Sequence, residues 1–228
     1  MNAKPLPADS RLAPRQARSR ATADRLLRAT IQILDEKGLD AALIPAIAAA
    51  AKVAPASVYR RFADKEDLLR TAFLWLLHNG VHGNRERARE QMLRATLPGT
   101  ARRLVQLWFE QYRQHPGLFR ALMRFLETDT NTRFVDEARS ILRGNIELVV
   151  DLLLTHRKEF ARGITRKDVR FAVFHVGSSV YTYMLDPQSL WHTEPSFSEA
   201  ELARLLTRDL LAFLQGGRAS ARRLPEVD

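Results

Sequence analysis

Apolar residues recur every three or four positions along most of the chain, with polar and charged residues between them. This spacing gathers apolar side chains on one face of a helix, whereas a half-buried strand alternates strictly. We find no sustained alternation bounded by turn residues, so an all-α fold is expected. The pattern predicts a first helix that Gly38 ends, and further helices over 45–51, 55–62, from Asp64 onward, and over 84–95, 99–114, 117–128, 133–157, 166–184 and 198–215.

Residues that begin or end helices support these boundaries. Gly38 suits the left-handed position that follows a helix, and Pro45 and Pro55 suit a first helical turn, where a missing N–H is harmless. Asp64 is placed to cap the helix that follows it, with Asp67 three residues later.

The segment 45–62 has the spacing of a helix-turn-helix. Two short helices flank the tight turn at 52–54, and in this motif the second helix lies in the major groove of DNA. Val58 and Phe62, four residues apart, are expected to face inward together with Val53.

The polar residues of the second short helix are expected to face DNA. Arg60 and Arg61 carry planar forks that can bond guanine O6 and N7 together, and the hydroxyl of Tyr59 can bond a phosphate or sugar. Ser57 shares this outward side. Lys65 begins the next helix, where backbone amides already favour a phosphate.

The charge of the chain agrees with this interpretation without proving it. A net charge of +10 and a pI near 10.6 favour a polyanionic partner, nucleic acid before an acidic membrane. A solvated basic surface would give the same composition. The residues expected to contact DNA are Arg18, Arg20, Lys52, Pro55, Ala56, Ser57, Tyr59, Arg60, Arg61 and Lys65.

The stretch AIAAAAKVAPASVYRRFADKEDLL, residues 46–69, resembles the signature of the TetR family of transcriptional regulators. The matching positions cover about residues 20–75 and keep the order and spacing of the family. They are Ile47-Ala48, Ala51-x-Val53, Tyr59-x-x-Phe62 and Lys65-Glu66-x-Leu68.

Four positions depart from the family pattern. Lys52 stands where the family usually has glycine in the turn, and Ala54 replaces the serine or threonine that caps the reading helix. Leu43 replaces a threonine that often touches a phosphate, and Ala56 fills a frequent glycine position. We expect Lys52, Arg60 and the basic N-terminal arm to compensate for the lost phosphate contacts.

The resemblance implies a division into two functional parts. A flexible basic arm over 1–18 precedes a helix-turn-helix DNA-binding domain over 19–63. A larger helical domain over 64–217 is expected to bind a small-molecule effector and to form a homodimer, and 218–228 is a flexible tail. Such a homodimer would bind a palindromic double-stranded operator.

The second domain contains aromatic side chains that suit an apolar ligand cavity. The residues expected to line it are Trp108, Tyr112, Phe119, Met123, Phe171, His175 and Ser178. The alternative is that these side chains fill the core. For dimerisation we expect a small-residue stripe of Val173, Val176, Gly177 and Val180, with a partner helix over 198–215; packing within one chain is again the alternative.

Other classes of protein are less well supported. The chain has no cysteine, which removes disulfides and thiolate chemistry and fits a reducing compartment. His78 and His82 are four apart, but glycines interrupt their helix and no third ligand is evident, so no metal site is expected. No catalytic triad, phosphate loop or cofactor site is evident, nor a signal peptide or membrane span, which favours a cytoplasmic protein that is not an enzyme.

The sequence therefore predicts a DNA-binding transcriptional regulator, a repressor that a small ligand releases from its operator. The alternative is a constitutive, architectural DNA-binding protein without a ligand. An α-helical enzyme is a weaker alternative.

Overall fold

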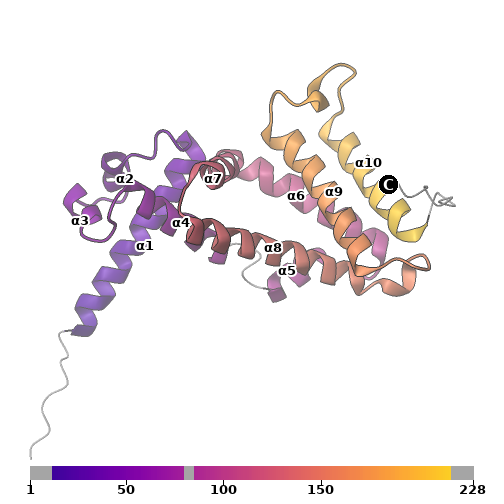
Figure 1. Ribbon diagram of the computed structural model, residues 1–228, viewed down its shortest axis with the longest axis horizontal. Helices are drawn as coiled ribbons and strands as arrows, with labels where there is room; N and C mark the ends of the chain where they lie inside the picture. Colours follow the sequence, from indigo (N-terminus) through magenta and orange to yellow (C-terminus); the bar gives the residue numbers. More distant parts are fainter. Residues whose placement is uncertain (1–11, 80–84, 217–228) are drawn as a thin grey trace, which may run out of the picture. The chain divides into compact units, whose positions relative to one another are not determined.

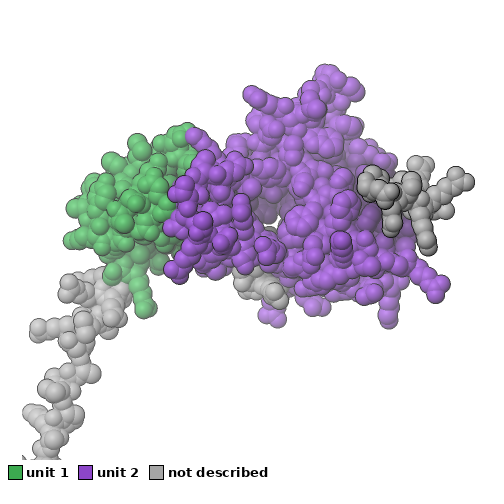
Figure 2. Space-filling model, viewed as in Figure 1, with its two compact units in different colours: residues 1–76 green, residues 77–228 purple. Residues whose placement is uncertain are grey.

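The computed structural model describes residues 12–79 and 85–216, without the side chains of residues 12–18, 85 and 87. Throughout these ranges the regular structure is helical and contains no strand, which confirms the all-α prediction (Figure 1). The chain divides into two compact units, Met1–Leu76 and Leu77–Asp228 (Figure 2).

Unit 1 is built on one long helix. It contains α1 (Leu12–Lys37), α2 (Ile44–Ala50), α3 (Pro55–Tyr59) and most of α4 (Lys65–Asn79). Helix α2 packs against both α1 and α3. The apolar face predicted for each helix is buried, with Leu26, Leu34, Ile47, Val58 and Phe73 fully enclosed.

Helix α1 starts earlier than the sequence suggested. It begins at Leu12, whereas the pattern placed a flexible arm over 1–18. Alanine, arginine and glutamine between 12 and 21 are good helix formers, and Pro14 lies in the first turn, where it does not break the helix. Residues 1–11 of the predicted arm and the predicted tail at 218–228 lie outside the described residues.

The predicted boundary between the two parts also shifts. The sequence placed it after residue 63, whereas α4 remains with unit 1 as far as Leu76. Helix α4 starts as predicted, because Asp64 Oδ1 accepts a hydrogen bond of 2.7 Å from the Asp67 N–H. Asp67 Oδ2 in turn accepts one of 3.0 Å from the Ala63 N–H. The buried Leu68 and Phe73 then account for the attachment of α4 to unit 1.

Unit 2 consists of longer helices. They are α5 (Arg85–Met92), α6 (Leu97–Gln114), α7 (Pro116–Thr128), α8 (Thr132–Leu154), α9 (Arg166–Leu185) and α10 (Glu199–Gln215), with 3₁₀ turns at Arg157–Glu159 and Leu190–His192. Helix α9 packs against α6, α8 and α10, and α6 also packs along α10. Trp108 fills the space beside Gly177, where an added Cβ would lie 3.7 Å from its ring.

The last two helices have well-capped ends. Thr165 and Asp168 form a reciprocal capping box at the start of α9, and Ser198 and Glu201 form another at the start of α10. Gly216 ends α10 in the left-handed conformation, with φ of 71°. These are the start and stop signals that the sequence pattern uses.

A buried polar network ties the start of α6 to the segment after α8. Thr100 Oγ1 lies 2.9 Å from His156 Nε2, and His156 Nδ1 lies 3.2 Å from Glu159 Oε1. The carboxylate of Glu159 accepts a hydrogen bond of 3.0 Å from the Leu97 N–H, and Thr100 Oγ1 accepts one of 2.9 Å from the Arg94 N–H. The network therefore satisfies the N–H of Leu97, which the start of α6 leaves open, and the N–H of Arg94 in the segment before α6.

Across residues 12–79 and 85–216, no helix combines the length and the apolar character that crossing a bilayer requires.

Candidate nucleic-acid interface

The turn between α2 and α3 places a lysine in an unfavourable backbone conformation. Lys52 has φ of 55°, the one positive φ among the described non-glycine residues. The turn is closed by hydrogen bonds from the Lys52 N–H to the Ala49 carbonyl (3.0 Å) and from the Val53 N–H to the Ala48 carbonyl (2.9 Å). A side chain in this region costs about 1 kcal/mol relative to glycine. Lys52 therefore adopts the left-handed backbone that suits the glycine usual at this position of the family pattern.

Both short helices begin without a side-chain cap. Ala54 precedes α3 and Leu43 precedes α2, and neither provides an oxygen for the first free amides. Leu43 is also 52% exposed, which is unusual for a leucine. Proline in the first turn of each helix removes one unsatisfied donor but leaves the others.

Helix α3 has one buried side and one exposed side. Val58 and Phe62 are buried, as predicted, whereas Val53 is half-buried. Tyr59 is 59% exposed, and Arg60 is exposed beside it. The buried pair fixes the orientation of α3 and thereby holds Tyr59 and Arg60 toward solvent.

The two arginines after Tyr59 have different environments. Arg60 is exposed, and its Nη2 donates a hydrogen bond of 2.8 Å to Ser57 Oγ. Arg61 is half-buried and donates to the Ser57 carbonyl (3.1 Å) and to Ser19 Oγ of α1 (3.4 Å). Arg61 is thus less exposed than Arg60, because its guanidinium bonds toward Ser57 and α1.

Arg61 also has an unsatisfied donor. Its Nε is buried and has no hydrogen-bond partner within the described part of the chain. Leaving such a donor unpaired costs about 1–3 kcal/mol. Arg61 therefore joins α3 to α1, and only Arg60 of this pair projects freely.

The remaining predicted DNA contacts lie on the surface of unit 1. Lys52, Pro55, Ala56 and Arg20 are exposed, and Lys65 is half-buried at the first position of α4. The backbone of Arg18 lies in α1, but its side chain is outside the described residues. The role of these residues in binding DNA stays a prediction.

The two short helices pack on each other, and the first also packs against α1. The second presents an exposed tyrosine and arginine. This arrangement defines a helix-turn-helix DNA-binding domain. Residues 26–72 match the family described as bacterial regulatory proteins, tetR family. Residues 26–72 are therefore a DNA-binding domain of the TetR family of transcriptional regulators.

Curated relatives have the same general description. An uncharacterized HTH-type transcriptional regulator of Mycobacterium bovis is 28% identical over 135 residues, which cover 55% of this chain and 61% of the relative. A regulator of Mycobacterium tuberculosis matches with the same figures. The matched part thus spans about three fifths of the length of these relatives.

Solved structures extend the likeness in fold to most of the chain. The fatty acid degradation regulator FadR of Bacillus halodurans matches with a TM-score of 0.60 and 20% identity, covering 86% of this chain and 96% of that one. A TetR-family regulator of Mesorhizobium loti reaches 0.62 at 20% identity, covering 86% and 96%. FadR of Bacillus subtilis, solved in complex with stearoyl-CoA, reaches 0.59 at 20% identity, covering 84% and 97%.

The predicted ligand residues fall into two separate groups in unit 2. Trp108 is buried, and Tyr112, Phe119 and Met123 are half-buried, with the Tyr112 and Phe119 rings 4.8 Å apart edge to face. Burial, with a smaller effect of the nearby Tyr181, raises the pKa of Tyr112 to about 12.

The other predicted ligand residues lie on the outer side of α9. Phe171 is 62% exposed, and His175 and Ser178 are exposed near it. They line a shallow hollow of about 370 Å³ with Phe174. The structure therefore does not bring the seven residues into one cavity.

The prediction that a stripe of small residues on α9 forms the dimer contact is wrong, because these residues do not form an exposed surface. Val173, Val176 and Val180 are buried within the chain, and Gly177 contacts Trp108. These residues pack the core of unit 2, which was the alternative considered from the sequence.

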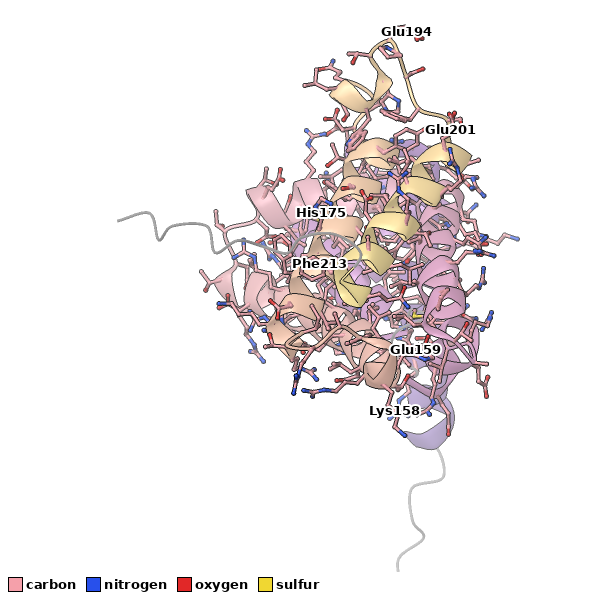
Figure 3. The ribbon with its side chains drawn as sticks, turned by 90° about the vertical axis from the view of Figure 1, so that its right-hand side faces the viewer. Lys158, Glu159, His175, Glu194, Glu201 and Phe213 are labelled. Atoms are coloured by element: carbon pink, nitrogen blue, oxygen red, sulfur yellow. The ribbon has the colours of Figure 1, made fainter. Side chains whose placement is uncertain are left out.

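A different face of α9 is exposed and apolar. Phe171, Phe174 and His175 are exposed on it, and Phe213 of α10 joins them with its ring 5.9 Å from that of Phe171. Figure 3 shows His175 and Phe213 on the same side of unit 2. Their spacing of three and four residues along α9 was readable in the sequence as a second apolar stripe. We call Phe171, Phe174, His175 and Phe213 the aromatic face.

Metal ligands do not gather in the part of the chain that the structure describes. His78 Nε2 lies 3.5 Å from Glu137 Oε1, and no group of three candidate ligand side chains is found in residues 12–79 and 85–216. His82 lies outside the described residues.

Proposed function

We propose that this protein is a dimeric repressor that reads a palindromic operator with α3 and leaves it when a small ligand binds to unit 2. The observation that carries the DNA-binding part is the exposed pair Tyr59 and Arg60 on a helix fixed by buried Val58 and Phe62. This is the arrangement that a reading helix needs, because its outer side chains must reach base edges while its inner ones hold it in place.

Arg60 is the residue that we propose to read a base. Its bond to Ser57 Oγ holds the guanidinium over the exposed side of α3 while leaving other N–H groups free. In the complex, those groups bond O6 and N7 of a guanine. Tyr59 and Lys52 contact the backbone and position the helix.

Exposure of the aromatic face supports dimerisation through it. Large aromatic side chains exposed together on two adjacent helices are typical of a protein interface. A two-fold axis there gives a four-helix interface from α9 and α10 of two subunits. Two copies of α3 then reach half-sites about 10 base pairs apart or further.

The effector part of the proposal is supported by the fold and by the aromatic cluster of Trp108, Tyr112, Phe119 and Met123. The FadR structure of Bacillus subtilis holds stearoyl-CoA, so a helical unit of this general fold accommodates a ligand with an apolar chain. A ligand that prefers one arrangement of the two reading heads shifts the population toward it and weakens DNA binding.

The DNA-binding part is tested with a salt-titrated binding assay. Fluorescence anisotropy compares the DNA upstream of the protein's own gene with unrelated DNA of equal length. We expect tight binding of the upstream DNA that survives about 0.2 M salt, while binding of the unrelated DNA collapses. Equal, salt-sensitive binding to both would contradict specific recognition and favour an architectural DNA-binding protein.

The dimer is tested with Phe171→Glu and light scattering. A carboxylate in the centre of the aromatic face is expected to give a folded monomer with much weaker operator binding. Ser196→Glu, in the exposed loop before α10, is the control and should remain dimeric. An unchanged dimer with Phe171→Glu would place the interface elsewhere.

A further inference from the structure

A large groove of unit 2 lies outside all the residues discussed above. It runs between α6 and α10, has a volume of about 1110 Å³ and is open to solvent along its length. Its floor is apolar, with buried Phe109 from α6 and half-buried Ala203 and Leu211 from α10. Ala200 and Ala212 line the α10 side of the groove, where their small side chains leave space.

The rim of the groove is rich in arginine. Arg102 and Arg113 belong to α6, and Arg204 and Arg208 belong to α10. Two glutamates also line the groove, but each is already bonded to an arginine. Glu110 accepts hydrogen bonds of 3.0 and 3.2 Å from Arg103, and Glu199 accepts two from Arg113.

Helices α6 and α10 run antiparallel along the groove. The two ends of the groove differ in charge. The pair of Arg113 and Glu199 joins the last turn of α6 to the first turn of α10 and neutralises that end. With a rise of about 1.5 Å per residue, Arg102 and Arg208 lie at similar distances from this pair, at the opposite end. That end contains no glutamate among the residues that line the groove.

The cationic end is incompletely paired. Arg102 is exposed and makes no hydrogen bond or ion pair with any residue in the described ranges. Arg208 has one long contact of 3.7 Å with Asp209, its neighbour in sequence. Guanidinium groups in such a position can bind a carboxylate or phosphate through parallel hydrogen bonds.

We propose that this groove binds an amphipathic anion. The apolar chain of the ligand lies on Phe109, Ala203 and Leu211, and its carboxylate or phosphate lies between Arg102 and Arg208. An apolar floor with a few convergent polar groups is typical of small-molecule sites. The charge at one end and its neutralisation at the other fix the direction in which the ligand lies.

Nucleic acid fits this groove less well than an amphipathic anion does. A basic path for nucleic acid needs positive charge along its whole length, whereas one end here is neutralised by an internal ion pair. The groove is also distinct from the aromatic face. Leu211 and Phe213 are two residues apart, about 200° around the helix, so the groove and the aromatic face occupy opposite sides of α10.

The test is direct binding of soluble probes, measured by isothermal titration calorimetry with the full chain and without DNA. Decanoate is the main probe, and decyl phosphate tests a different anionic head group. Decanol has the apolar chain without the anion, and butyrate has the carboxylate without a long chain. We expect saturable binding of decanoate or decyl phosphate, and much weaker binding of decanol and butyrate. The difference between the two anions identifies the preferred head group.

Three variants locate the site. Arg102→Gln with Arg208→Gln removes the cationic end and should weaken binding of the anion by about tenfold or more, without changing that of decanol. Ala203→Phe fills the floor and should abolish binding of both. Arg143→Gln, on the exposed side of α8, is the matched control and should bind like the original protein.

Circular dichroism and thermal unfolding establish that each variant is folded. Binding that survives both the double substitution and Ala203→Phe would place the ligand elsewhere and overturn the proposal, as would no binding of either anion. Because no DNA is present, these outcomes are independent of the proposed repressor function. A separate titration with operator DNA shows whether the anion also weakens DNA binding.

Discussion

The helix pairs α2–α3 and α9–α10 differ in how the ends of their helices are stabilised. Helices α9 and α10 begin with complete capping boxes, and α10 ends at a glycine. Helices α2 and α3 begin without side-chain caps, and a lysine with positive φ lies between them. The difference shows that α9 and α10 are stabilised by side chains at their own ends, whereas α3 depends on the tertiary contacts of Val58 and Phe62. Local strain of this kind is common where a chain binds another molecule.

The largest expected effect is the difference in stability lost when a side chain is truncated on the core side or on the outer side of α10. Leu210→Ala removes a fully buried side chain from the core of unit 2 and should lower the free energy of unfolding by about 2–5 kcal/mol. Phe213→Ala, three residues later on the aromatic face, should cost less than about 1 kcal/mol in the monomer. Urea denaturation at low protein concentration measures both. Equal losses would contradict the assignment of Phe213 to an outer surface.

A second prediction concerns the different roles of Arg60 and Arg61. Arg60→Ala should weaken binding to the operator by about 1–3 kcal/mol and relax the preference at one base pair, while leaving stability nearly unchanged. Arg61→Ala should instead leave the base preference unchanged, and its effect on stability should be small, because loss of the contacts with Ser57 and Ser19 is offset by removal of the unpaired Nε. Anisotropy with single-base operator variants, combined with thermal unfolding, distinguishes the two outcomes. A loss of base preference in Arg61→Ala alone would reverse the assignment.

A third prediction concerns two substitutions that should stabilise the turn between α2 and α3 and the start of α3. Lys52→Gly should stabilise the protein by less than about 1 kcal/mol, because relief of the positive φ is partly offset by the greater freedom of the unfolded chain. Ala54→Ser should contribute about 0.5–2 kcal/mol by capping α3. Chemical denaturation measures both changes. The proposed phosphate contact of Lys52 predicts that Lys52→Gly also lowers DNA affinity and reduces its salt dependence by about one ion.

The smallest effect concerns the ion pairs between α8 and α9. Hydrogen bonds from Arg170 and Arg166 lower the pKa of Glu147 to about 2. A carboxyl with a depressed pKa in the folded state stabilises the protein above its unfolded pKa, and this contribution is lost as the pH falls toward 2. Glu147→Gln should therefore lower the melting temperature slightly at pH 7 and leave it unchanged near pH 2. A larger loss in acid would contradict this sign.

Much of the architecture could be predicted from the sequence because its signals are local. Helix boundaries at Pro55, Asp64, Thr165 and Gly216 follow from residues within one turn. The helix-turn-helix was recognisable because its residue types and spacing are set by the turn itself.

The errors have a different origin. Which side of α9 faces the core depends on Trp108, about 70 residues away in sequence, which packs against Gly177. The groove between α6 and α10 arises only when two helices 100 residues apart pack together, so its arginines do not form a pattern along the chain.

The network of Thr100, His156 and Glu159 has a consequence for the exchange of backbone amides with solvent deuterium. Amides at the first turn of a helix usually exchange fast, because they have no partner within the helix. Here the N–H of Leu97, the first residue of α6, donates to Glu159. Its deuterium uptake should be slow and should increase in His156→Ala, which removes the contact between His156 and Glu159.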